Sequence, residues 1–338
     1  MDRSAAESSG SCQGLRSELG GRRRGFFHLF RAADRREGVA ALIELKSTDV
    51  PEMLPFRLRL AQLAATIYRF HTLRIAGRLF SGVSGVTPRA FFGRTLYVDT
   101  SRGNPQRLLY LEGERFVTER RIVAGLVRPG FAAIDVGANI GYYALMLARY
   151  VGSSEIVCIE PEPANLIELR RNIARNRLSN VTIIPAAAAC QSGSASFLTG
   201  INGRVVHGGA GEISVTTFML DSLRDRRVGF VKIDVEGFEL DVLRGAAGLI
   251  REQRPNLFVE VHPMFQSDAR GVGHILALLS EYYPSAVAYR KREGTLLNKV
   301  GERYLGCVSL KSGPVDSSLI SCPDIFWIAC RGDASARR

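Results

Sequence analysis

The stretch from Phe131 to Pro163 constrains this chain more than any other, because it predicts a strand, a glycine loop, a helix and a second strand in succession. The apolar run 132–136 leads into the loop Gly137-Ala-Asn-Ile-Gly141, and the apolar run 157–159 leads into Glu160. This order is typical of the nucleotide-binding half of an open α/β sheet, in which ligands bind beyond the carboxyl ends of the strands.

The glycines of this loop and the acid after the second strand suit a bound nucleoside. Gly137 and Gly141 have no Cβ, so a ligand can approach the backbone closely and the turn can adopt a positive φ. Glu160 follows at the tip of the next strand, where a carboxylate can accept both hydroxyls of a ribose. The sequence therefore predicts that these three residues bind a nucleoside, and the competing interpretation is a turn that only joins strand to helix.

The same loop lacks the middle glycine of a dinucleotide-binding loop. A dinucleotide fingerprint has three glycines, whereas the middle position here is Asn139, whose side chain would crowd a pyrophosphate. Asp135, just before the turn, would repel phosphate and would attract an ammonium group. S-adenosylmethionine has an ammonium group and no phosphate. We predict that it binds here, with Gly137, Asn139 and Gly141 beside its methionine part and Asp135 near its ammonium group.

A third predicted strand, 230–234, ends in a group of acids. Asp234 is followed by Glu236 and Glu239, and all three belong to the same sheet edge as the glycine loop. Such carboxylates could hold substrate hydroxyls, accept a proton or bind a divalent cation, although no specific metal-binding motif is present. The alternative for Glu236 and Glu239 is capping of the helix that follows.

A fourth predicted strand, 257–261, leads into His262. Glu260 and His262 alternate with valines, so both side chains face one side of the strand. A histidine at the carboxyl end of a strand could serve as a general base, and the alternative is a histidine that orients the loop before Pro263. The predicted catalytic residues are thus Asp234, Glu236 and His262.

Five segments of the chain resemble the FkbM-type methyltransferases: Ile-Asp-Val-Gly-Ala-Asn-Ile-Gly (134–141), Ile-Glu-Pro (159–161), Val-Lys-Ile-Asp-Val-Glu-Gly-Phe-Glu (231–239), Val-Leu-Arg-Gly-Ala (242–246) and Val-Glu-Val-His (259–262). The resemblance spans roughly 110–265, with a closing strand after 320. It implies a Rossmann-like, seven-stranded, mostly parallel sheet of the class I methyltransferases, S-adenosylmethionine as the methyl donor, and O-methylation of a hydroxyl on a small molecule or sugar.

The pattern along the chain predicts three regions. Residues 1–50 read as a disordered basic tail, 51–94 as a basic amphipathic helical extension, and 95–332 as the methyltransferase domain. In the last region we expect strands and helices besides those above, namely strands at 95–100, 107–111, 180–184, 195–198, 213–217, 286–289 and 325–330, and helices at 114–126, 141–150, 163–176, 239–251 and 270–282. The glycine-rich stretch 203–211 is expected to be a mobile loop.

Charge and cysteine content bear on partners and compartment. The net charge of +12 is concentrated between Met53 and Val98, which holds seven arginines and no Asp, Glu or Lys. Leucines at helical spacing within 56–80 would allow peripheral membrane contact, or packing on the catalytic domain. The sequence has no uncharged apolar run of about 18 residues, so we expect no membrane-spanning helix. The six cysteines form no Cys-x-x-Cys pair, so we expect reduced thiols in the cytoplasm.

Two other functions compete with methylation of a small molecule. The basic segment could track the phosphates of RNA, as an RNA methyltransferase would require. However, the acids at 234–239 would repel a nucleic-acid backbone, so nucleic acid is not the favoured partner. The second competitor is a methyltransferase-fold protein that binds without catalysis. A nicotinamide-dependent oxidoreductase is disfavoured by Asn139, and neither the acceptor nor the oligomeric state follows from the sequence.

Overall fold

The computed structural model describes residues 85–103, 106–107, 109–110, 117–200, 203–206, 211–266, 271–284, 286–291, 304–310, 317–320, 322 and 325–332. All of them lie in the unit Pro51–Arg338. The expected disordered tail and the amphipathic segment 56–80 lie outside the described residues.

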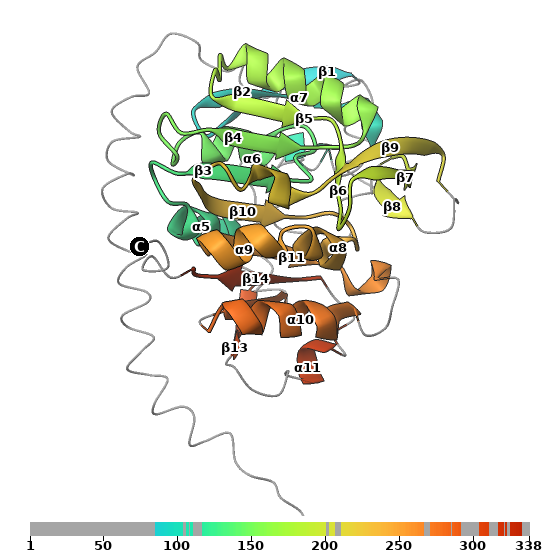
Figure 1. Cartoon of the computed structure of the whole chain (residues 1–338). Coiled ribbons are helices and arrows are strands. Elements are labelled where there is room, and N and C mark those ends of the chain that lie inside the picture. Colours follow the sequence, from blue (N-terminus) through green and yellow to red (C-terminus); the bar gives the residue numbers. More distant parts are fainter. Residues whose placement is uncertain are drawn as a thin grey trace, which may run out of the picture. The chain divides into compact units, whose positions relative to one another are not determined.

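The unit is built on an eight-stranded sheet (Figure 1). The strands, in spatial order, are β13 (Tyr304–Leu310), β12 (Ala286–Lys291), β14 (Phe326–Cys330), β11 (Asn256–Val261), β10 (Val228–Ile233), β3 (Ala132–Val136), β4 (Ile156–Ile159) and β5 (Val181–Ile184). The five strands from β11 to β5 run parallel, whereas β14 is antiparallel to both of its neighbours. The predicted mostly parallel α/β sheet is confirmed, with β13 as one strand more than the seven expected.

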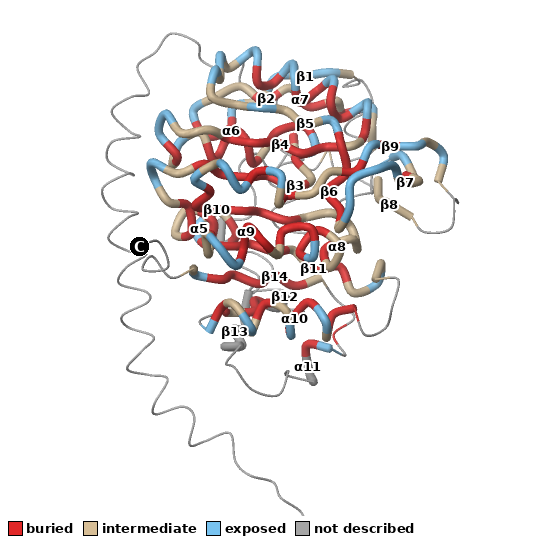
Figure 2. The backbone as a smooth tube through the Cα atoms, in the orientation of Figure 1, coloured by how far each residue is buried: buried red, intermediate tan, exposed pale blue. Residues whose placement is uncertain are grey.

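The inner strands form because their residues, apart from Asp135 and Lys232, are apolar and are buried on both faces. Alternate side chains enter two separate cores. Ala133, Phe230 and Phe258 belong to the core on one face of the sheet, and Ile134 and Val231 belong to the core on the other face. Figure 2 shows these buried strands at the centre of the unit.

Each core is closed by its own set of helices. The first core contains residues of α5 (Val117–Leu126), α6 (Tyr142–Leu147) and α7 (Pro163–Arg175), and of the antiparallel hairpin β1 (Val86–Phe91) and β2 (Arg94–Asp99). The second contains residues of α8 (Glu239–Arg244), α9 (Ala247–Gln253), α10 (Gly271–Tyr282) and α11 (Ser317–Ile320). The sheet is therefore covered by helices on both faces, as predicted for this class.

Three local predictions from the sequence were wrong. Residues 86–91, at the end of the expected helical extension, form strand β1, because their side chains alternate in exposure. The expected strand 107–111 is helical at the described residues 106–107 and 109–110. The expected helix 239–251 breaks into α8 and α9 at Gly245, where a Cβ would lie 1.9 Å from the carbonyl oxygen of Ala189, so the chain approaches its neighbour too closely for an unbroken helix.

A second, four-stranded sheet lies between β5 and β10 in the sequence. Its strands, in spatial order, are β6 (Ala187–Ala188), β9 (Ile213–Phe218), β7 (Gly193–Leu198) and β8 (Arg204–Val206). The expected strands 195–198 and 213–217 are confirmed, and they form the antiparallel pair β7–β9. β8 falls inside the stretch 203–211 that was expected to be a mobile loop, and residues 207–210 lie outside the described residues. This small sheet is labelled to the right of the large one in Figure 1.

One buried side chain fastens the hairpin to the rest of the fold. The Oδ1 atom of Asn172, on α7, accepts a hydrogen bond from Tyr97 N at 2.7 Å, and its Nδ2 donates to the Ile140 carbonyl oxygen at 2.7 Å and to the Tyr97 carbonyl oxygen at 3.2 Å. Asn172 is fully buried, so no water can replace these partners.

We expect Asn172→Ala to lower the free energy of unfolding by about 2 kcal/mol or more, because it leaves buried backbone groups without partners. Urea denaturation measures the change. Arg171→Ala, at an exposed position of the same helix, should change stability by no more than about 0.5 kcal/mol. Equal stability of the two variants would show that the Asn172 contacts do not hold the hairpin in place.

Candidate active site

A cavity with about 670 Å³ of open space lies where the carboxyl ends of β3, β4 and β10 meet the small sheet. Its wall contains Gly137, Asn139, Glu160, Asp234 and Glu236, which are five of the eight predicted site residues. The remaining wall is formed by Val136, Ile159, Pro161, Asn165, Ala186, Ala187, Ala188, Phe197, Gly203, Arg204, Val205, Val235 and Phe238. The predicted cofactor residues and the predicted catalytic acids thus face one shared space.

The glycine loop has a conformation that only glycine permits at its first position. Gly137 has a φ of +74°, and a Cβ there would lie 1.9 Å from the carbonyl oxygen of Asp234. Asn139 also has a positive φ, of 49°, which asparagine tolerates better than most residues. The loop is therefore drawn tightly against the acidic loop that follows β10.

Gly141 does not belong to the cavity wall. Its φ is +96°, and a Cβ there would lie 2.9 Å from Cδ1 of Leu169. Glycine at this position lets the start of α6 pack against α7, so its role is in packing, and the predicted contact with the methionine part of a cofactor is not supported by the cavity.

Glu160 lies in the cavity wall with its carboxylate held by three donors. Its Oε2 accepts a hydrogen bond from Asn139 N at 2.8 Å, and its Oε1 accepts from Glu162 N at 3.0 Å and from Asn165 Nδ2 at 3.2 Å. Burial raises the pKa of this carboxyl group to about 7, although the three donors act in the opposite direction. The carboxylate is thus oriented by the backbone at the tip of β4, and its oxygens retain lone pairs for further donors.

A buried lysine that the sequence analysis did not single out links the glycine loop to the acidic segment after β10. Lys232 is the register partner of Asp135 in the neighbouring parallel strands β10 and β3. Its ammonium lies 3.2 Å from Asp135 Oδ1 and 3.5 Å from Asp234 Oδ2, and it donates a hydrogen bond to the Gly137 carbonyl oxygen at 3.0 Å. The two carboxylates raise the pKa of Lys232 although burial opposes them, so the lysine stays charged.

Asp135 is completely buried and is absent from the cavity wall. The expectation that it lies near the ammonium group of a cofactor stays a prediction, and in the structure its carboxylate faces Lys232. The sequence contained a signal for this pair. Asp135 and Lys232 are polar residues one position before the ends of two otherwise apolar strands, and neighbouring parallel strands bring such positions together.

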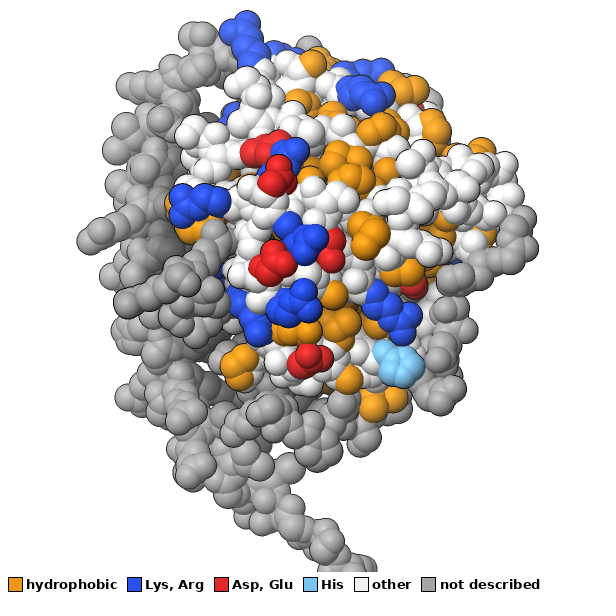
Figure 3. Space-filling view, in the orientation of Figure 1, with side chains coloured by type: hydrophobic (Ala, Val, Ile, Leu, Met, Phe, Trp, Pro, Cys, Tyr) orange, Lys and Arg blue, Asp and Glu red, His pale blue; other side chains and the backbone are white. Residues whose placement is uncertain are grey.

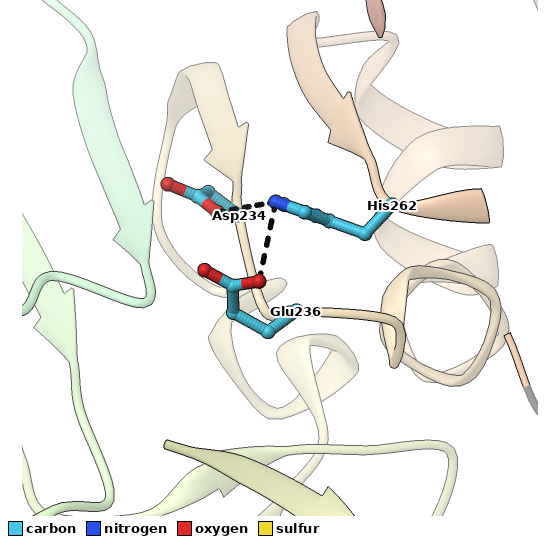
Figure 4. Close-up of side chains that lie close together, drawn as sticks. All are labelled: Asp234, Glu236 and His262. Atoms are coloured by element: carbon cyan, nitrogen blue, oxygen red, sulfur yellow. Dashed lines mark ion pairs between the residues drawn. The ribbon is translucent and has the colours of Figure 1, made fainter. Parts of the chain in front are cut away.

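The second half of the site consists of Asp234, Glu236 and His262 (Figure 4). The two acids lie on the segment after β10, and His262 follows β11, with its Nε2 3.4 Å from Glu236 Oε2 and 3.9 Å from Asp234 Oδ1. Glu260 Oε1 also lies 3.9 Å from the same nitrogen. The structure therefore brings together all three predicted catalytic residues.

Glu239, for which helix capping was the alternative interpretation, lies within hydrogen-bond distance of His262. It is fully buried, and its Oε1 accepts a hydrogen bond from Gly237 N at 2.9 Å and lies 2.9 Å from His262 Nδ1. Its second oxygen accepts a hydrogen bond from Gln266. This carboxylate fixes the orientation of the imidazole and turns Nε2 toward Glu236 and Asp234.

His262 and Glu236 differ in protonation state near neutral pH. Burial lowers the pKa of His262, but the hydrogen bond to Glu239 and the neighbouring carboxylates outweigh it and raise that pKa to about 9. Burial is also the main reason that the pKa of Glu236 rises to about 7, against the attraction of His262. Near neutral pH, His262 is therefore an imidazolium, whereas Glu236 is close to its midpoint of titration.

Asp234, Glu236 and His262 could also surround a metal ion. Each offers one ligand atom, and these atoms all lie within 4.8 Å of one another. A metal would have to displace the proton from His262, because a histidine binds metals in its neutral form. The arrangement thus admits two kinds of chemistry, proton transfer and cation binding.

Comparison with known proteins gives a consistent result. Residues 135–289 match the model of the methyltransferase FkbM domain. The chain is similar to the methyltransferase sdnD of Sordaria araneosa, with 27% identity, and the match covers 33% of this chain and 59% of that protein. The chain thus spans about three fifths of the length of this curated relative.

Two solved structures are similar to the chain. One is the methyltransferase FkbM of Methylobacillus flagellatus KT, with 21% identity, a TM-score of 0.37, and coverage of 60% of this chain and 51% of that chain. The other is M. jannaschii TYW2 in complex with AdoMet, with 14% identity, a TM-score of 0.38, and coverage of 74% and 85%, respectively.

We expect Lys232→Met to lower the free energy of unfolding by about 3–5 kcal/mol, because it leaves Asp135 buried without its partner. The double variant Lys232→Met/Asp135→Leu removes both charges and should recover most of that loss. Arg244→Met, which removes an exposed charge on α8, serves as the control in the same urea titrations. A single variant as stable as the control would mean that the bridge does not support the fold.

Proposed function

We propose that the protein methylates a hydroxyl oxygen of a small molecule or sugar with S-adenosylmethionine as the donor, because residues 135–289 match the model of the methyltransferase FkbM domain. The observation that carries the proposal is the shared cavity, which has a nucleoside-binding rim on one side and a group of carboxylates on the other. A hydroxyl acceptor needs both, since the methyl donor and a group that takes the hydroxyl proton must lie beside the same oxygen atom.

The residues at the carboxyl ends of β3 and β4 fit S-adenosylmethionine. Gly137 lies in the cavity wall, where it has no side chain to block a nucleoside, and its missing Cβ also lets the loop pack against the carbonyl oxygen of Asp234. Glu160 holds an oriented carboxylate in the wall, which suits the two hydroxyls of a ribose. The wall contains three acids, Glu160, Asp234 and Glu236, and one basic residue, so the cavity favours a positively charged ligand such as a sulfonium.

The donor, when bound, supplies a methyl carbon on a positively charged sulfur, which keeps the electron pair of the broken bond as the acceptor oxygen forms the new one. The residues of the chain have to hold the acceptor hydroxyl at this carbon and remove its proton. Positioning of this kind is worth up to about 7–11 kcal/mol. Asp234 and Glu236 lie in the wall at the carboxyl end of β10, where they can accept hydrogen bonds from the acceptor.

We assign the proton-accepting role to Glu236, with His262 as a positioning residue. An imidazolium with a pKa of about 9 cannot accept a proton at neutral pH, whereas a carboxylate with a pKa of about 7 can. His262 lies between the carboxylates and reduces their mutual repulsion. This assignment replaces the general base role that the sequence pattern indicated for His262.

RNA methylation is the second candidate function, and only the basic composition favours it. Most of the arginine-rich segment 53–98 lies outside the described residues. On the face drawn in Figure 3, basic and acidic side chains are interspersed. A track for a phosphate backbone would instead require a continuous basic stripe. The acids of the cavity also oppose such a ligand, so a small acceptor is the stronger proposal. A non-catalytic binding protein would not need the oriented pair of Glu239 and His262.

We further propose that the protein acts in the cytoplasm. In the described part of the chain, Cys158, Cys190 and Cys330 are free thiols, as expected in a reducing compartment. No helix in the described part of the chain is long and apolar enough to span a membrane. Peripheral membrane contact through 56–80 remains part of the proposal, and vesicle sedimentation of the full chain tests it.

Replacement of Glu160 tests the donor site. Glu160→Gln removes the charge that would receive the ribose hydroxyls, so the affinity for S-adenosylmethionine in titration calorimetry should fall about tenfold or more. Glu252→Gln, at an exposed position of α9, is the matched control and should leave the affinity unchanged. Wild-type protein that does not bind S-adenosylmethionine would refute the proposed function, and an unaffected Glu160→Gln variant would refute this binding mode.

The pH dependence tests the proton acceptor. Transfer of a labelled methyl group to a panel of hydroxylated small molecules and sugars identifies a working acceptor. With that acceptor and saturating donor, kcat/KM should rise with pH through an apparent pKa at or below about 7, since Glu236 accepts a proton only as the carboxylate and the bound sulfonium favours that form. Glu236→Gln should lower kcat about 100-fold and remove this rise. A variant that keeps the wild-type profile would show that another group takes the proton.

The same assay separates proton transfer from metal chemistry. If Glu236 acts directly, removal of divalent cations with EDTA leaves the rate unchanged. A rate that is lost with EDTA and restored by Mg²⁺ would show that a cation lies among Asp234, Glu236 and His262 and activates the hydroxyl as a Lewis acid.

A further inference from the structure

The cavity wall contains a single basic residue, Arg204, among the described residues. It begins strand β8 of the small sheet, where it pairs with Leu198 of β7. The other charged residues of the wall are Glu160, Asp234 and Glu236. A lone cation in an acidic wall does not serve the positively charged groups of the donor, so it calls for an anionic group as its partner.

Arg204 is held in place by stacking. Its guanidinium carbon lies 4.7 Å from the centre of the Phe265 ring. Phe265 in turn stacks on the imidazole of His262, with ring centres 6.2 Å apart and an angle of 25° between the planes. The three side chains thus form a stack. His262, beside Asp234 and Glu236, stands at one end, and the guanidinium of Arg204 stands at the other.

The backbone on both sides of this stack is closely packed. A Cβ on Gly203, next to Arg204, would lie 2.8 Å from Glu162 Oε2 and 2.9 Å from Cζ of Phe197. A Cβ on Gly237 would lie 2.5 Å from Cβ of Phe265. These two glycines allow β8 and the loop after β11 to approach the cavity, so the position of Arg204 is set by the fold.

No acid neutralises this guanidinium within the described part of the chain. Arg204 forms no ion pair there with Asp234 or Glu236, although both line the same cavity. A guanidinium that stacks through its face still presents its N–H groups at the edge, in a planar fork that matches a carboxylate or a phosphate. The structure thus contains an oriented donor group without an acceptor.

We propose that Arg204, stacked on Phe265, binds an oxyanion of the acceptor, so that the acceptor is a hydroxyl compound that also carries a carboxylate or a phosphate. This inference rests on the proposed function and narrows its substrate class to hydroxy acids, sugar acids and sugar phosphates. The oxyanion pairs with Arg204 while the hydroxyl of the same molecule lies at Asp234 and Glu236.

The donor also carries a carboxylate, but the geometry assigns Arg204 to the acceptor. The donor residues are Gly137, Asn139 and Glu160, at the ends of β3 and β4. Arg204 instead contacts Phe265, which follows β11 and stacks on His262, and His262 Nε2 lies 3.4 Å from Glu236 Oε2. These contacts link the guanidinium to the carboxylates that we assign to the acceptor.

Three matched probes test the proposal with the full chain saturated with S-adenosylhomocysteine. Glucose, glucuronate and glucose 6-phosphate share a sugar ring and differ in charge. Saturation-transfer NMR titrations should show that both anions bind at least about tenfold more tightly than glucose. Arg204→Gln should abolish this difference, Arg204→Lys should retain part of it, and Arg171→Gln, which removes an exposed arginine of α7, should leave it intact.

Calorimetry with S-adenosylmethionine keeps this test separate from that of the proposed function. Arg204→Gln should bind the donor as the wild type does. A large loss of donor affinity would assign Arg204 to the methionine carboxylate and overturn the proposal. It is also overturned if the three probes bind equally, if neither anion binds, or if Arg171→Gln removes the preference as Arg204→Gln does. Wild-type protein that does not bind the donor would instead refute the function itself.

Discussion

The buried bridge from Asp135 through Lys232 to Asp234 is the interaction on which the rest of the site depends. It joins the end of β3 to the end of β10, and the same ammonium donates to the Gly137 carbonyl oxygen. Two of these charges, on Asp135 and Lys232, are buried, where each would be unstable alone. The donor loop and the acidic loop cannot shift independently, so the bridge fixes the distance between the two halves of the cavity.

The charges around the cavity explain why a cation is the fitting ligand. Burial raises the pKa of both Glu160 and Glu236 to about 7, which means that the protein holds these carboxylates against an electrostatic penalty. A sulfonium placed between them offsets that penalty and favours their ionised forms. Under the proposed function, burial thus raises the pKa of both the acid assigned to the nucleoside and the acid assigned to the proton, and binding of the donor would favour the ionised proton acceptor.

The sequence predicted the parts of this site that follow from local pattern. Apolar strands that end in Gly137, Glu160, Asp234 and His262 place those residues on one edge of a parallel sheet, and the structure has them there. The pairing of Asp135 with Lys232 depends on which strands are neighbours, which is a property of the whole sheet. Arg204 and Phe265 come from segments with no periodic pattern, and the eighth strand and the break at Gly245 arise from contacts between distant parts of the chain. Patterns of one segment cannot reveal such contacts.

The central claim is that one cavity, fixed by the Lys232 bridge, takes a sulfonium nucleoside at the ends of β3 and β4. A crystal structure of the full chain with S-adenosylhomocysteine tests it most directly. The account predicts that the ribose hydroxyls lie on the carboxylate of Glu160 and that the sulfur faces Asp234 and Glu236. A nucleoside bound elsewhere, or one that leaves Glu160 without contact, would contradict it.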